Sequence, residues 1–547
     1  MNIEPKIIEL LKKRGIETGE EIHEFLSSKP QKTYDPFLLH NMEEGVDLIL
    51  SAIEEDKKIC IYGDYDADGI TSTVIMMDVL THLTKNIMYY IPSRFDEGYG
   101  LNMDAIDKIQ SMGGELIITV DCGSVSKDEV DHAKEIGMEI LVTDHHRVSD
   151  KIADCPVINP NQPDCNYPCP HIAGCGVAFK ICQAIVSVTG LEKSILNRTL
   201  DMLGIGTIGD IVPLVDENRT FAKYGIRAIN SGVRKNLRML IERVGLKQGE
   251  ITSEKVSFGI VPYLNAAGRM EHASLAVQMF LSEDENETSE MIEKLCSLNT
   301  ERKNTQDIIF KNCIEIIEED YKNSDIFLVY LPHAHEGVTG IVAGKVKERY
   351  NRPSIILTDS DEGFVKGTGR SAGELNIYDL LKACDDLFKS FGGHRAACGF
   401  TLAKEKLEEL RRRVSLGMEK MLEENSRLLD RTIEEEIELE PRDLSIKLVR
   451  QLSLLEPCGA GNEKPVIAAS GTPVRVSRMG RDNQFLRFYQ DLGENKLLQC
   501  VNFNNPKFIE NLLEDNAAVK VVGRVGINSW NGNDSIQMTV ETVIPEV

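Results

Sequence analysis

The chain has 547 residues, of which 42% are apolar and 27% are charged, and its formal net charge is −25. This length exceeds what one hydrophobic core supports and predicts three or more domains of about 100–200 residues each. There is no apolar run of about 18 residues, and the polar N-terminal stretch lacks the apolar core of a signal peptide. We therefore expect a cytoplasmic protein without a membrane span. The negative charge argues against an extended basic groove for duplex DNA, but it leaves local basic sites open.

The cysteine content indicates reduced thiols. Thirteen cysteines are an odd number, and they are spread through segments that we expect to be strands and helices. Disulfide frameworks are typical of small chains from oxidising compartments. One local group combines Cys155, Cys165, Cys169, His171 and Cys175, but its spacing lacks the C-x-x-C pairs of structural zinc sites. We expect buried or loop thiols there, with a zinc site as the alternative.

The first 50 residues are predicted to form short helices, because apolar residues recur at helical spacing. These residues are Ile7, Leu10 and Leu11, followed by Ile22, Phe25 and Leu26. From Lys58 onward the pattern changes to short apolar runs with room for a helix between them. The runs cover 59–62, 87–91, 116–120 and 140–143. Strands that alternate with helices predict an α/β fold with a parallel sheet covered on both faces.

Hard metal ligands follow three of these strands. The residues are Asp64, Asp66 and Asp68 after the first strand, Asp121 after the third, and Asp144-His145-His146 after the fourth. A further acid, Asp210, follows the apolar, glycine-rich run 203–209. Ligands of open α/β sheets bind beyond the carboxyl ends of the strands, so we expect these side chains to converge. Carboxylates with one or two imidazoles suit a pair of Mg²⁺ or Mn²⁺ ions, and such pairs support phosphoester hydrolysis.

Three other motifs are weaker. The stretch from Asp64 to Gly69 fits the start of an EF-hand loop, but Ile75 stands where that loop needs a glutamate. The run 340–345 is one residue short of a phosphate-binding P-loop. The run 204–209 matches G-x-G-x-x-G, yet it does not open a βαβ unit, so we expect no nucleotide site there.

The C-terminal half contains a second α/β pattern and then an all-β module. The second pattern comprises apolar runs at 326–330 and 354–357, a helix over 340–350, and Gly392-Gly393-His394. After a charged helix over 404–425, short alternating segments with frequent turn signals predict the β module, with a hairpin turn at Trp530-Asn531-Gly532-Asn533. The predicted parts are an N-terminal helical segment (1–50), a metal-binding domain (51–250), a helical connector (251–320), a second α/β domain (321–425) and the β module (426–547).

The motifs, in this order, resemble those of the DHH phosphoesterase superfamily. They are GDYDADG at 63–69, VDCG at 120–123, TDHH at 143–146 and GTIGD at 206–210. Within that superfamily the chain is similar to the RecJ family of single-strand-specific exonucleases over nearly its full length. Further segments carry this similarity: 92–102, 264–269, 335–338, 367–371 and 392–394. The resemblance implies that the second α/β domain is a substrate-binding DHHA1 domain and that the β module is an OB-fold.

The resemblance also implies roles for single residues. It assigns metal binding to Asp64, Asp66, Asp68, Asp121, His145 and Asp210, and catalysis to Asp66, Asp68, Asp121, His145 and His146. Asp121 is expected to bridge two Mn²⁺ or Mg²⁺ ions, His146 to contact the scissile phosphate or to orient a ligand, and Asp144 to hold an imidazole. Phosphate binding falls to Arg94, Arg269, His335, Arg370, Ser371 and His394.

The terminal β module carries basic and aromatic residues in alternation. Arginines at 475, 478, 481 and 487 are interleaved with aromatic residues at 485, 488 and 489. Aromatic platforms flanked by cations suit single-stranded nucleic acid. The alternative is that the aromatic residues belong to the core of the module and the arginines to its surface.

The implied activity is 5′-to-3′ hydrolysis of single-stranded DNA to mononucleotides, in DNA repair and recombination. A narrow passage between the two α/β domains would admit a single strand and exclude duplex. A helicase and a single-strand-binding protein are possible partners. Two alternatives are a DHH phosphodiesterase for short oligonucleotides or cyclic dinucleotides, and a non-catalytic DNA-binding scaffold. The first class lacks a terminal β module and the second typically loses metal ligands, so the sequence favours the exonuclease.

Overall fold

The computed structural model describes residues 3–95, 97–98, 100–148, 153–360, 363–430, 432–503, 506–513, 518–530 and 533–545. The chain divides into two compact units. Unit 1 comprises Met1–Leu264, Ala276–Ile292 and Ile433–Val547, and unit 2 comprises Asn265–Leu275 and Glu293–Thr432. Among the described residues, no helix combines the length and the apolar character needed to cross a membrane.

A five-stranded parallel sheet forms the centre of the first part of unit 1. Its order is β2-β1-β3-β4-β5. The bounds are β1 Ile59–Tyr62, β2 Ile87–Tyr90, β3 Leu116–Thr119, β4 Glu139–Thr143 and β5 Val157–Ile158. Tyr62 pairs with Tyr90 on one side and Thr119 on the other, so neighbouring strands end level with one another. The predicted parallel sheet is confirmed, and β5 is a strand that the sequence pattern did not indicate.

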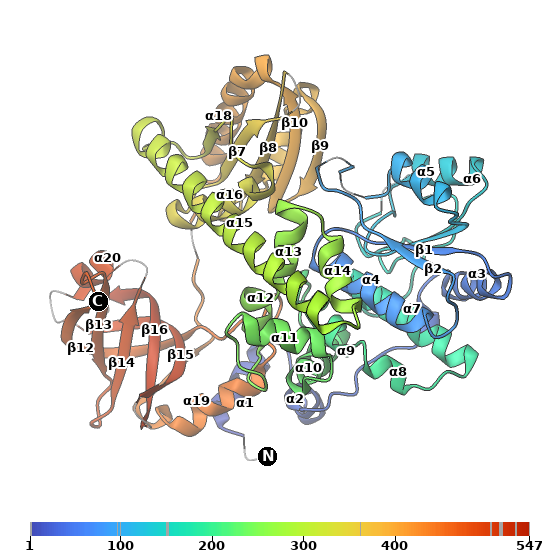
Figure 1. Cartoon of the computed structure of the whole chain (residues 1–547). Helices are drawn as coiled ribbons and strands as arrows, with labels where there is room; N and C mark the ends of the chain where they lie inside the picture. The colour runs from blue at the N-terminus through green and yellow to red at the C-terminus, as the bar shows by residue number, and fades with distance from the viewer. Residues whose placement is uncertain are drawn as a thin grey trace. The chain divides into compact units, whose positions relative to one another are not determined.

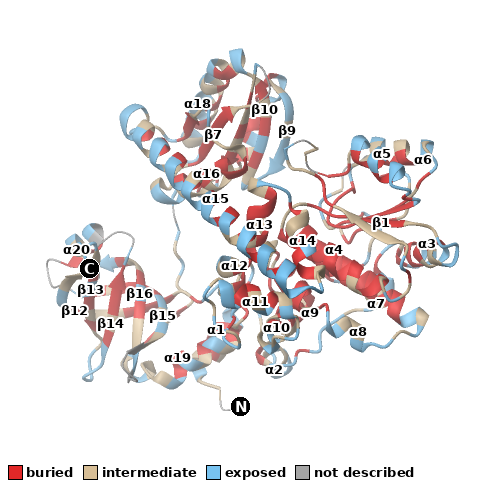
Figure 2. Cartoon of the chain, in the orientation of Figure 1, coloured by how far each residue is buried: buried red, intermediate tan, exposed pale blue. Residues whose placement is uncertain are grey.

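Helices cover both faces of this sheet, as predicted (Figure 1). Cys60, Ile117 and Val142 pack on one face against α5 (Met103–Ser111) and α6 (Lys127–Glu135). The other face is covered by α3 (Met42–Glu54), α4 (Ala67–Leu80) and α7 (Gly174–Thr189). Within α4 only Asp78 is not buried, which is expected of a helix packed on all sides (Figure 2).

Glycines allow the next helices to pack closely against this layer. They are α8 Ser194–Asn197, α9 Leu200–Gly209, α10 Asp216–Ser231, α11 Lys235–Arg243 and α12 Ser253–Gly259. A Cβ atom on Gly204 of α9 would lie 2.6 Å from the Cα atom of Gly225 in α10. The G-x-G-x-x-G match therefore lies inside a helix at a helix–helix contact.

Unit 2 contains a mixed five-stranded sheet of order β6-β7-β8-β10-β9, in which only β6 and β7 are parallel. The strands are β6 Phe327–Tyr330, β7 Ser354–Asp359, β8 Phe364–Arg370, β9 Phe388–His394 and β10 Ala397–Ala403. Its helices are α16 Glu336–Tyr350, α17 Ile377–Lys382 and α18 Leu407–Glu424. Of the helices that precede the sheet in the chain, α13 Val261–Met270 and α15 Glu285–Asp320 contribute residues to both units, and α14 Ser274–Leu281 belongs mostly to unit 1. This confirms the second α/β pattern, with its first helix starting at Glu336.

The end of the chain forms a closed β-barrel, which confirms the predicted OB-type module. Its strands are β11 Ile437–Glu438, β12 Ile467–Met479, β13 Phe485–Asp491, β14 Leu497–Asn502, β15 Val519–Trp530 and β16 Asn533–Pro545, with helices α19 Ile446–Leu452 and α20 Pro506–Leu513. The order is β11-β12-β13-β14-β16-β15, and pairing of β12 with β15 closes the barrel. The predicted hairpin joins β15 to β16, although Asn531 and Gly532 lie outside the described residues.

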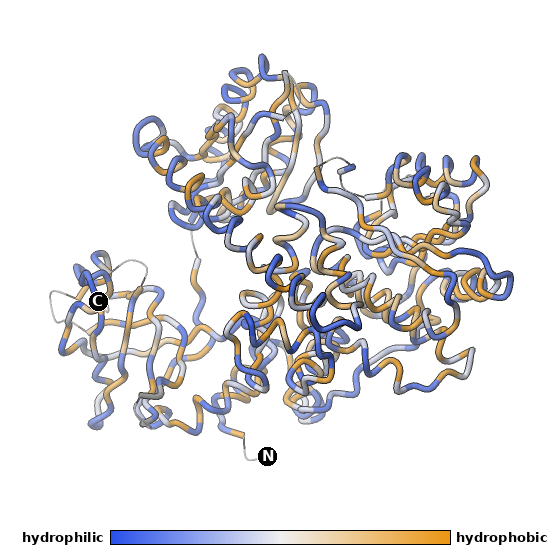
Figure 3. The backbone as a smooth tube through the Cα atoms, viewed as in Figure 1, coloured by the Kyte–Doolittle hydropathy of each residue, from blue (hydrophilic) through white to orange (hydrophobic). Residues whose placement is uncertain are grey.

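The N-terminal helices belong to the core of this barrel. These helices are α1 (Pro5–Lys13) and α2 (Gly19–Leu26), and Ile7, Leu10 and Leu11 are fully buried in one cluster with barrel residues such as Val521. The guanidinium of Arg14 donates two hydrogen bonds, of 2.6 and 2.9 Å, to the Glu436 carboxylate, 422 residues away. Figure 3 shows hydrophilic and hydrophobic residues alternating along the helices. This alternation is the pattern that predicts a helix with one buried face. The sequence predicted the helices but not the partner that covers them.

Candidate metal centre

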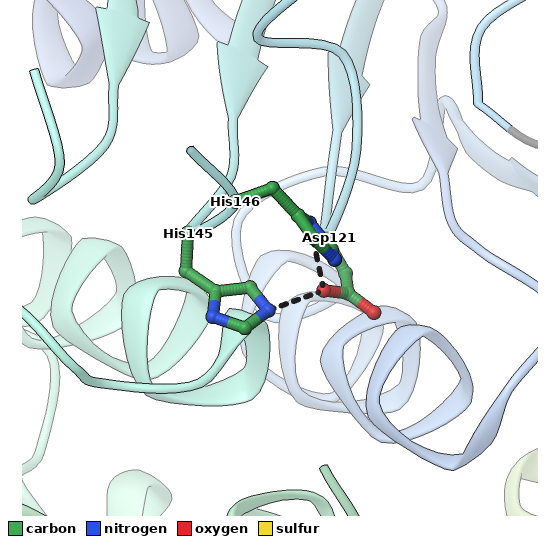
Figure 4. A group of neighbouring side chains, drawn as sticks. All are labelled: Asp121, His145 and His146. Atoms are coloured by element: carbon green, nitrogen blue, oxygen red, sulfur yellow. Dashed lines mark ion pairs between the residues drawn. The ribbon is translucent and has the colours of Figure 1, made fainter. Parts of the chain in front are cut away.

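Acidic and histidine side chains converge at the carboxyl end of the parallel sheet. Among the described residues, three groups have potential ligand atoms within 4.8 Å of one another. They are Asp121, His145 and His146; Asp68, His145 and Asp210; and Asp64, Asp66 and Asp121. Figure 4 shows the first group, in which both histidines lie beside the Asp121 carboxylate. Because Asp121 and His145 each belong to two groups, all seven predicted catalytic and metal-binding residues form one connected cluster.

The turn from β1 into α4 brings the first three acids together. Asp66 caps α4, since its Oδ1 atom accepts hydrogen bonds from the backbone N–H groups of Asp68 (2.8 Å) and Gly69 (3.1 Å). The chain therefore turns before Ala67, where α4 begins. A Cβ atom on Gly69 would lie 2.5 Å from the Asp64 carbonyl oxygen, so glycine allows the helix to press against the strand end.

Asp121 occupies a strained position at the centre of the cluster. Its φ of 63° lies in the left-handed region, which costs about 1–2 kcal/mol for a residue with a side chain. Its Oδ1 atom lies 3.1 Å from His145 Nε2 and 4.0 Å from His146 Nδ1 (Figure 4). Strain of this kind persists only where the surrounding structure enforces it, and it is frequent at functional sites.

Asp144 organises the loop that carries the two histidines. Its Oδ1 atom accepts hydrogen bonds from the backbone N–H groups of His145 (2.7 Å) and His146 (3.0 Å), and it lies 2.8 Å from His146 Nδ1. Its Oδ2 atom accepts a hydrogen bond from the Ser124 N–H (3.0 Å). The expected contact between Asp144 and an imidazole is therefore present, and His146 is the histidine that it orients.

Two asparagines that the sequence analysis did not identify form hydrogen bonds with the backbone of the same loop. The Asn159 side-chain amide donates to the His146 carbonyl oxygen (2.9 Å), and that of Asn161 donates to the His145 carbonyl oxygen (2.5 Å). Both residues follow β5, which has only two residues. The strand-end rule applies to them as well, but so short a strand gives no periodic signal.

Burial and mutual repulsion set the charge of the cluster. Burial and the neighbouring carboxylates raise the pKa values of Asp64, Asp68 and Asp121, and they raise the pKa of Asp210 to about 9. Burial also lowers the pKa of His145, which favours the neutral imidazole that a metal ligand needs. The raised pKa values arise because several buried carboxylates repel one another.

The protonation of His146 differs from that of His145. Burial alone would lower the pKa of His146, but the hydrogen bond and charge of Asp144 outweigh that effect and raise the pKa to about 9. The surroundings thus shift the pKa values of the two adjacent imidazoles in opposite directions.

Buried ligand atoms that make no hydrogen bond indicate that the cluster fits divalent cations. Asp64 Oδ1, Asp121 Oδ1 and His145 Nε2 are buried and make no hydrogen bond within the described part of the chain. Buried polar atoms are normally satisfied, so three orphans at one point indicate an unfilled coordination requirement. The donors are carboxylate oxygens and imidazole nitrogens, which suit Mn²⁺ and Mg²⁺. No cysteine belongs to any of the three ligand groups found among the described residues, so the zinc alternative receives no support.

Mn²⁺ is expected to raise the thermal unfolding midpoint of the chain, because the cation neutralises carboxylates that repel one another in its absence. Free ion at about 100 times its Kd stabilises the folded state by ~2.7 kcal/mol through mass action. Differential scanning calorimetry with and without Mn²⁺ measures the shift, and KCl at equal ionic strength is the control. Identical midpoints in both salts would contradict the metal assignment.

The residues predicted to bind phosphate lie in both units. In unit 1 the Arg94 guanidinium lies 5.1 Å from the centroid of the Tyr65 ring. In unit 2 the Arg269 guanidinium donates to the Gly337 carbonyl oxygen (3.1 Å), and the Gly337 N–H donates to His335 Nδ1 (3.2 Å). These contacts place Arg269 and His335 at the first turn of α16.

Arg370 and His394 lie at one end of the unit 2 sheet, since both pair with Ala397 of the strand between them. Arg370 Nη2 would lie 3.2 Å from a Cβ atom on Gly340, so it borders the same turn of α16. Burial lowers the pKa of Arg370, and among the described residues it forms no ion pair. Ser371 donates its hydroxyl hydrogen bond to the Leu375 carbonyl oxygen (2.6 Å).

The barrel presents a smaller aromatic surface than the sequence suggested. Phe488 is fully buried in the core and cannot serve as a stacking platform. Phe485 is engaged edge-on with Phe503 at a centroid distance of 5.0 Å. Tyr489 is half-buried, with the Arg475 guanidinium 5.7 Å from its ring centroid. Arginines and aromatic residues are interleaved in this part of the sequence because alternate residues of β13 face the core of the barrel.

Comparison with known proteins gives consistent matches along the whole chain. Family models match for the DHH family N-terminal domain at 58–207, the DHHA1 domain at 323–419 and the RecJ OB domain at 436–542. The single-stranded-DNA-specific exonuclease RecJ of Bacillus subtilis (strain 168) is 36% identical over 544 residues, which is 99% of this chain and 68% of the relative. RecJ of Thermus thermophilus in complex with Mn²⁺ has a TM-score of 0.83 at 27% identity, covering 100% of this chain and 76% of that one. In complex with Mg²⁺ the TM-score is 0.78 at 27% identity, with 100% and 75% covered.

Proposed function

The chain belongs to the RecJ family of the DHH phosphoesterases, and from that membership we propose that it is a metal-dependent exonuclease that degrades single-stranded DNA. It would cut from the 5′ end and release 5′-mononucleotides, in DNA repair and recombination in the cytoplasm. The observation that carries the proposal is the connected cluster of seven acidic and histidine residues with orphaned, buried ligand atoms.

Asp121 is the centre of the proposed metal site. It lies within ligand distance of Asp64 and Asp66 on one side and of the two histidines on the other, which supports its role as a bridge between two cations. Asp68, His145 and Asp210 would complete the second position. Two bound Mn²⁺ or Mg²⁺ ions supply an activated water and stabilise the leaving oxygen of a phosphodiester. The protein contributes rigid ligand positions, since Asp121 and His145 are buried or nearly so.

His146 is proposed to contact the scissile phosphate. Asp144 orients the ring, since its Oδ1 atom lies 2.8 Å from His146 Nδ1, and its hydrogen bond and charge raise the pKa of His146 and so favour the cationic form. A cationic imidazole is a poor metal ligand but a good donor to a phosphate oxygen. The two adjacent histidines would thus serve different purposes, with His145 on a metal ion and His146 on the substrate.

The unit 2 residues are proposed to bind the phosphates of the strand. The N-terminal part of α16 has no side chain at Gly337 and Gly340, and the Arg370 guanidinium lies next to Gly340. Helix N-termini and arginines without carboxylate partners both favour anions. Arg269, His335, Ser371 and His394, together with Arg94 of unit 1, would complete the contacts with neighbouring phosphates.

Replacing Arg370 by methionine is expected to raise KM for single-stranded DNA roughly 10- to 100-fold with a smaller change in kcat, as expected for loss of one charge-assisted hydrogen bond in substrate binding. Steady-state kinetics on a 5′-phosphorylated oligonucleotide measure both constants. Arg395→Met is the matched control, because Arg395 lies on the surface and already pairs with Glu374. A KM equal to that of the control would remove Arg370 from the substrate site.

We also propose a division of the work along the chain. Residues 51–250 would hold the metal ions, and residues 321–425 would bind the substrate phosphates. Residues 426–547 would bind the single strand. The helical segments 1–50 and 251–320 would support these domains. Tyr489 and Arg475 are the barrel residues that best suit a stacked base. A helicase that supplies unwound strand and a single-strand-binding protein are the proposed partners.

Digestion of end-labelled DNA tests the function. With Mn²⁺ present, a 5′-labelled single strand should lose its label at once as mononucleotide, whereas a 3′ label should persist until the strand is short. A blunt duplex should survive as the control. If long strands survived while substrates of a few nucleotides or cyclic dinucleotides were cleaved, a small-substrate phosphodiesterase would replace the exonuclease.

A further inference from the structure

Helix α7 directs its first turn at the metal cluster. The backbone N–H of Gly174 donates to Asp68 Oδ2 (2.6 Å), and that of Cys175 donates to Asp68 Oδ1 (2.9 Å). Ala173, at the N-cap position, offers no side-chain cap. Asp68, 106 residues earlier in the chain, therefore takes the place of the missing cap. Both oxygens of this carboxylate are fixed by backbone, so its plane is set whether or not a cation is bound.

The first residue of α7 also sets the position of Asp121. A Cβ atom on Gly174 would lie 2.6 Å from Asp121 Oδ1 and 2.7 Å from Asp121 Cβ. Asp121 cannot yield easily, because its side chain is buried and its backbone already holds a φ of 63°. Gly176, two residues later in the same helix, is different, since the nearest atom to its Cβ would be Ile172 Cβ at 3.2 Å.

A second glycine lies beside the same carboxylate of Asp68. A Cβ atom on Gly206 of α9 would lie 2.3 Å from Thr71 Oγ1, 2.5 Å from Cys175 Sγ and 2.7 Å from Asp68 Oδ1. The Gly206 carbonyl oxygen accepts the backbone hydrogen bond of Asp210 at 2.9 Å, so the same turn of α9 carries the last acid of the cluster. Two helices thus meet the cluster through residues without side chains.

We propose that Gly174 and Gly206 are positioning residues of the metal centre, and that the first turn of α7 is the scaffold that holds Asp68 and Asp121 at ligand distance. The positive end of the α7 dipole faces Asp68, which stabilises a carboxylate in a cluster where its neighbours oppose the charge. The absence of a side chain at residue 174 leaves the space that Asp121 occupies. This inference rests on the proposed ligand set and adds to it the residues that determine its geometry.

The test compares one substitution at two positions of the same helix. Gly174→Ala should weaken Mn²⁺ binding to the full chain at least tenfold, the range found when groups that orient metal ligands are changed. Gly176→Ala should leave it within about twofold, because its new methyl group meets no ligand. Electron paramagnetic resonance of free Mn²⁺ gives the dissociation constants without any nuclease assay. Circular dichroism and the metal-free melting midpoint establish that both variants fold.

A double-mutant cycle separates positioning from general damage. Asp121→Gly removes all the side-chain atoms that the new methyl group would meet, including the Cβ atom at 2.7 Å, so adding Gly174→Ala to it should produce no further loss of Mn²⁺ affinity. Equal losses in both backgrounds would overturn the proposal, as would equal affinities for the Gly174 and Gly176 variants. If Asp121→Gly alone left Mn²⁺ affinity unchanged, the ligand set itself would fail, which is a distinct outcome.

Gly206→Ala is the second variant if the Gly174 variant does not fold. Its methyl group would press on Thr71, Cys175 and Asp68 rather than on Asp121, and it too should weaken Mn²⁺ binding at least tenfold. Gly344→Ala is its control, because a Cβ atom there meets nothing within 4 Å. Unchanged Mn²⁺ affinity in a folded Gly206 variant would overturn the role assigned to α9.

Discussion

Replacing Asp121 by alanine is expected to lower the rate of DNA hydrolysis by roughly four orders of magnitude, the scale found when one essential member of a catalytic unit is lost. The effect should be this large because Asp121 belongs to two of the three ligand groups, so its removal disturbs both proposed cation positions. Binding of single strands should persist, since the proposed phosphate contacts of unit 2 do not involve this residue. Single-turnover hydrolysis and fluorescence anisotropy of a labelled strand measure the two properties.

Asp104→Ala serves as the control for this experiment. Asp104 is an exposed residue of α5, so it repeats the loss of one negative charge away from the cluster. Hydrolysis by that variant should equal that of the parent chain. Substantial residual cleavage by the Asp121 variant in Mn²⁺ would refute the metal-site assignment, whereas loss of strand binding would indicate that the substitution unfolds the chain.

Replacing Glu217 by leucine is expected to destabilise unit 1 by about 3–5 kcal/mol, because it leaves the Lys180 ammonium buried without its counter-ion. Lys180 in α7 and Glu217 in α10 form an ion pair with both side chains fully buried. Burial lowers the pKa of Lys180, which shows how unfavourable its charge becomes when the pair is broken. Glu217 also accepts hydrogen bonds from the Thr33 hydroxyl (2.7 Å) and the Tyr34 N–H (3.1 Å), so the pair joins the N-terminal segment to both helices.

Urea denaturation followed by circular dichroism measures this loss. The double variant Lys180→Met, Glu217→Leu should recover most of the stability, since apolar residues of similar volume often replace a buried pair without cost. Asp131→Asn is the control, because it breaks an exposed pair with Lys127 and should change stability by less than about 1 kcal/mol. A Glu217 variant as stable as this control would show that the pair is not needed to join these elements.

The sequence could predict the parts of the site that depend on local chain order. Asp64, Asp121 and His145 each follow an apolar run long enough to be recognised as a strand, and parallel strands bring such residues to one end of the sheet. Nothing comparable marks Asn159 and Asn161, because two residues of strand give no alternation to count. The predicted convergence was therefore right for these acidic and histidine residues, but it gave no information about the residues that support them.

Contacts between distant helices could not be predicted in the same way. An amphipathic pattern in α1 shows that Ile7 and Leu10 are covered, but it carries no information about which segment covers them. Gly174 is equally uninformative in the sequence, because a glycine at the start of a helix has many ordinary explanations. The reason for a glycine at this position becomes clear only in the folded chain, where Asp121, 53 residues earlier in the sequence, packs directly against it. The structure also shows that Phe488 belongs to the core of the barrel and not to its surface, a choice that the alternation in the sequence left open.

The pairing of α1 with the barrel has a consequence for the order in which the protein is made. Arg14 and Glu436 are 422 residues apart, and a ribosome adds about 5–20 residues per second. For roughly 20–80 seconds the apolar face of α1 is outside the ribosome while the strands that will cover it do not yet exist. During that interval Ile7, Leu10 and Leu11 offer a short hydrophobic segment to any chaperone near the tunnel exit. The earliest-made helix of this protein is thus among the last to find its native partners.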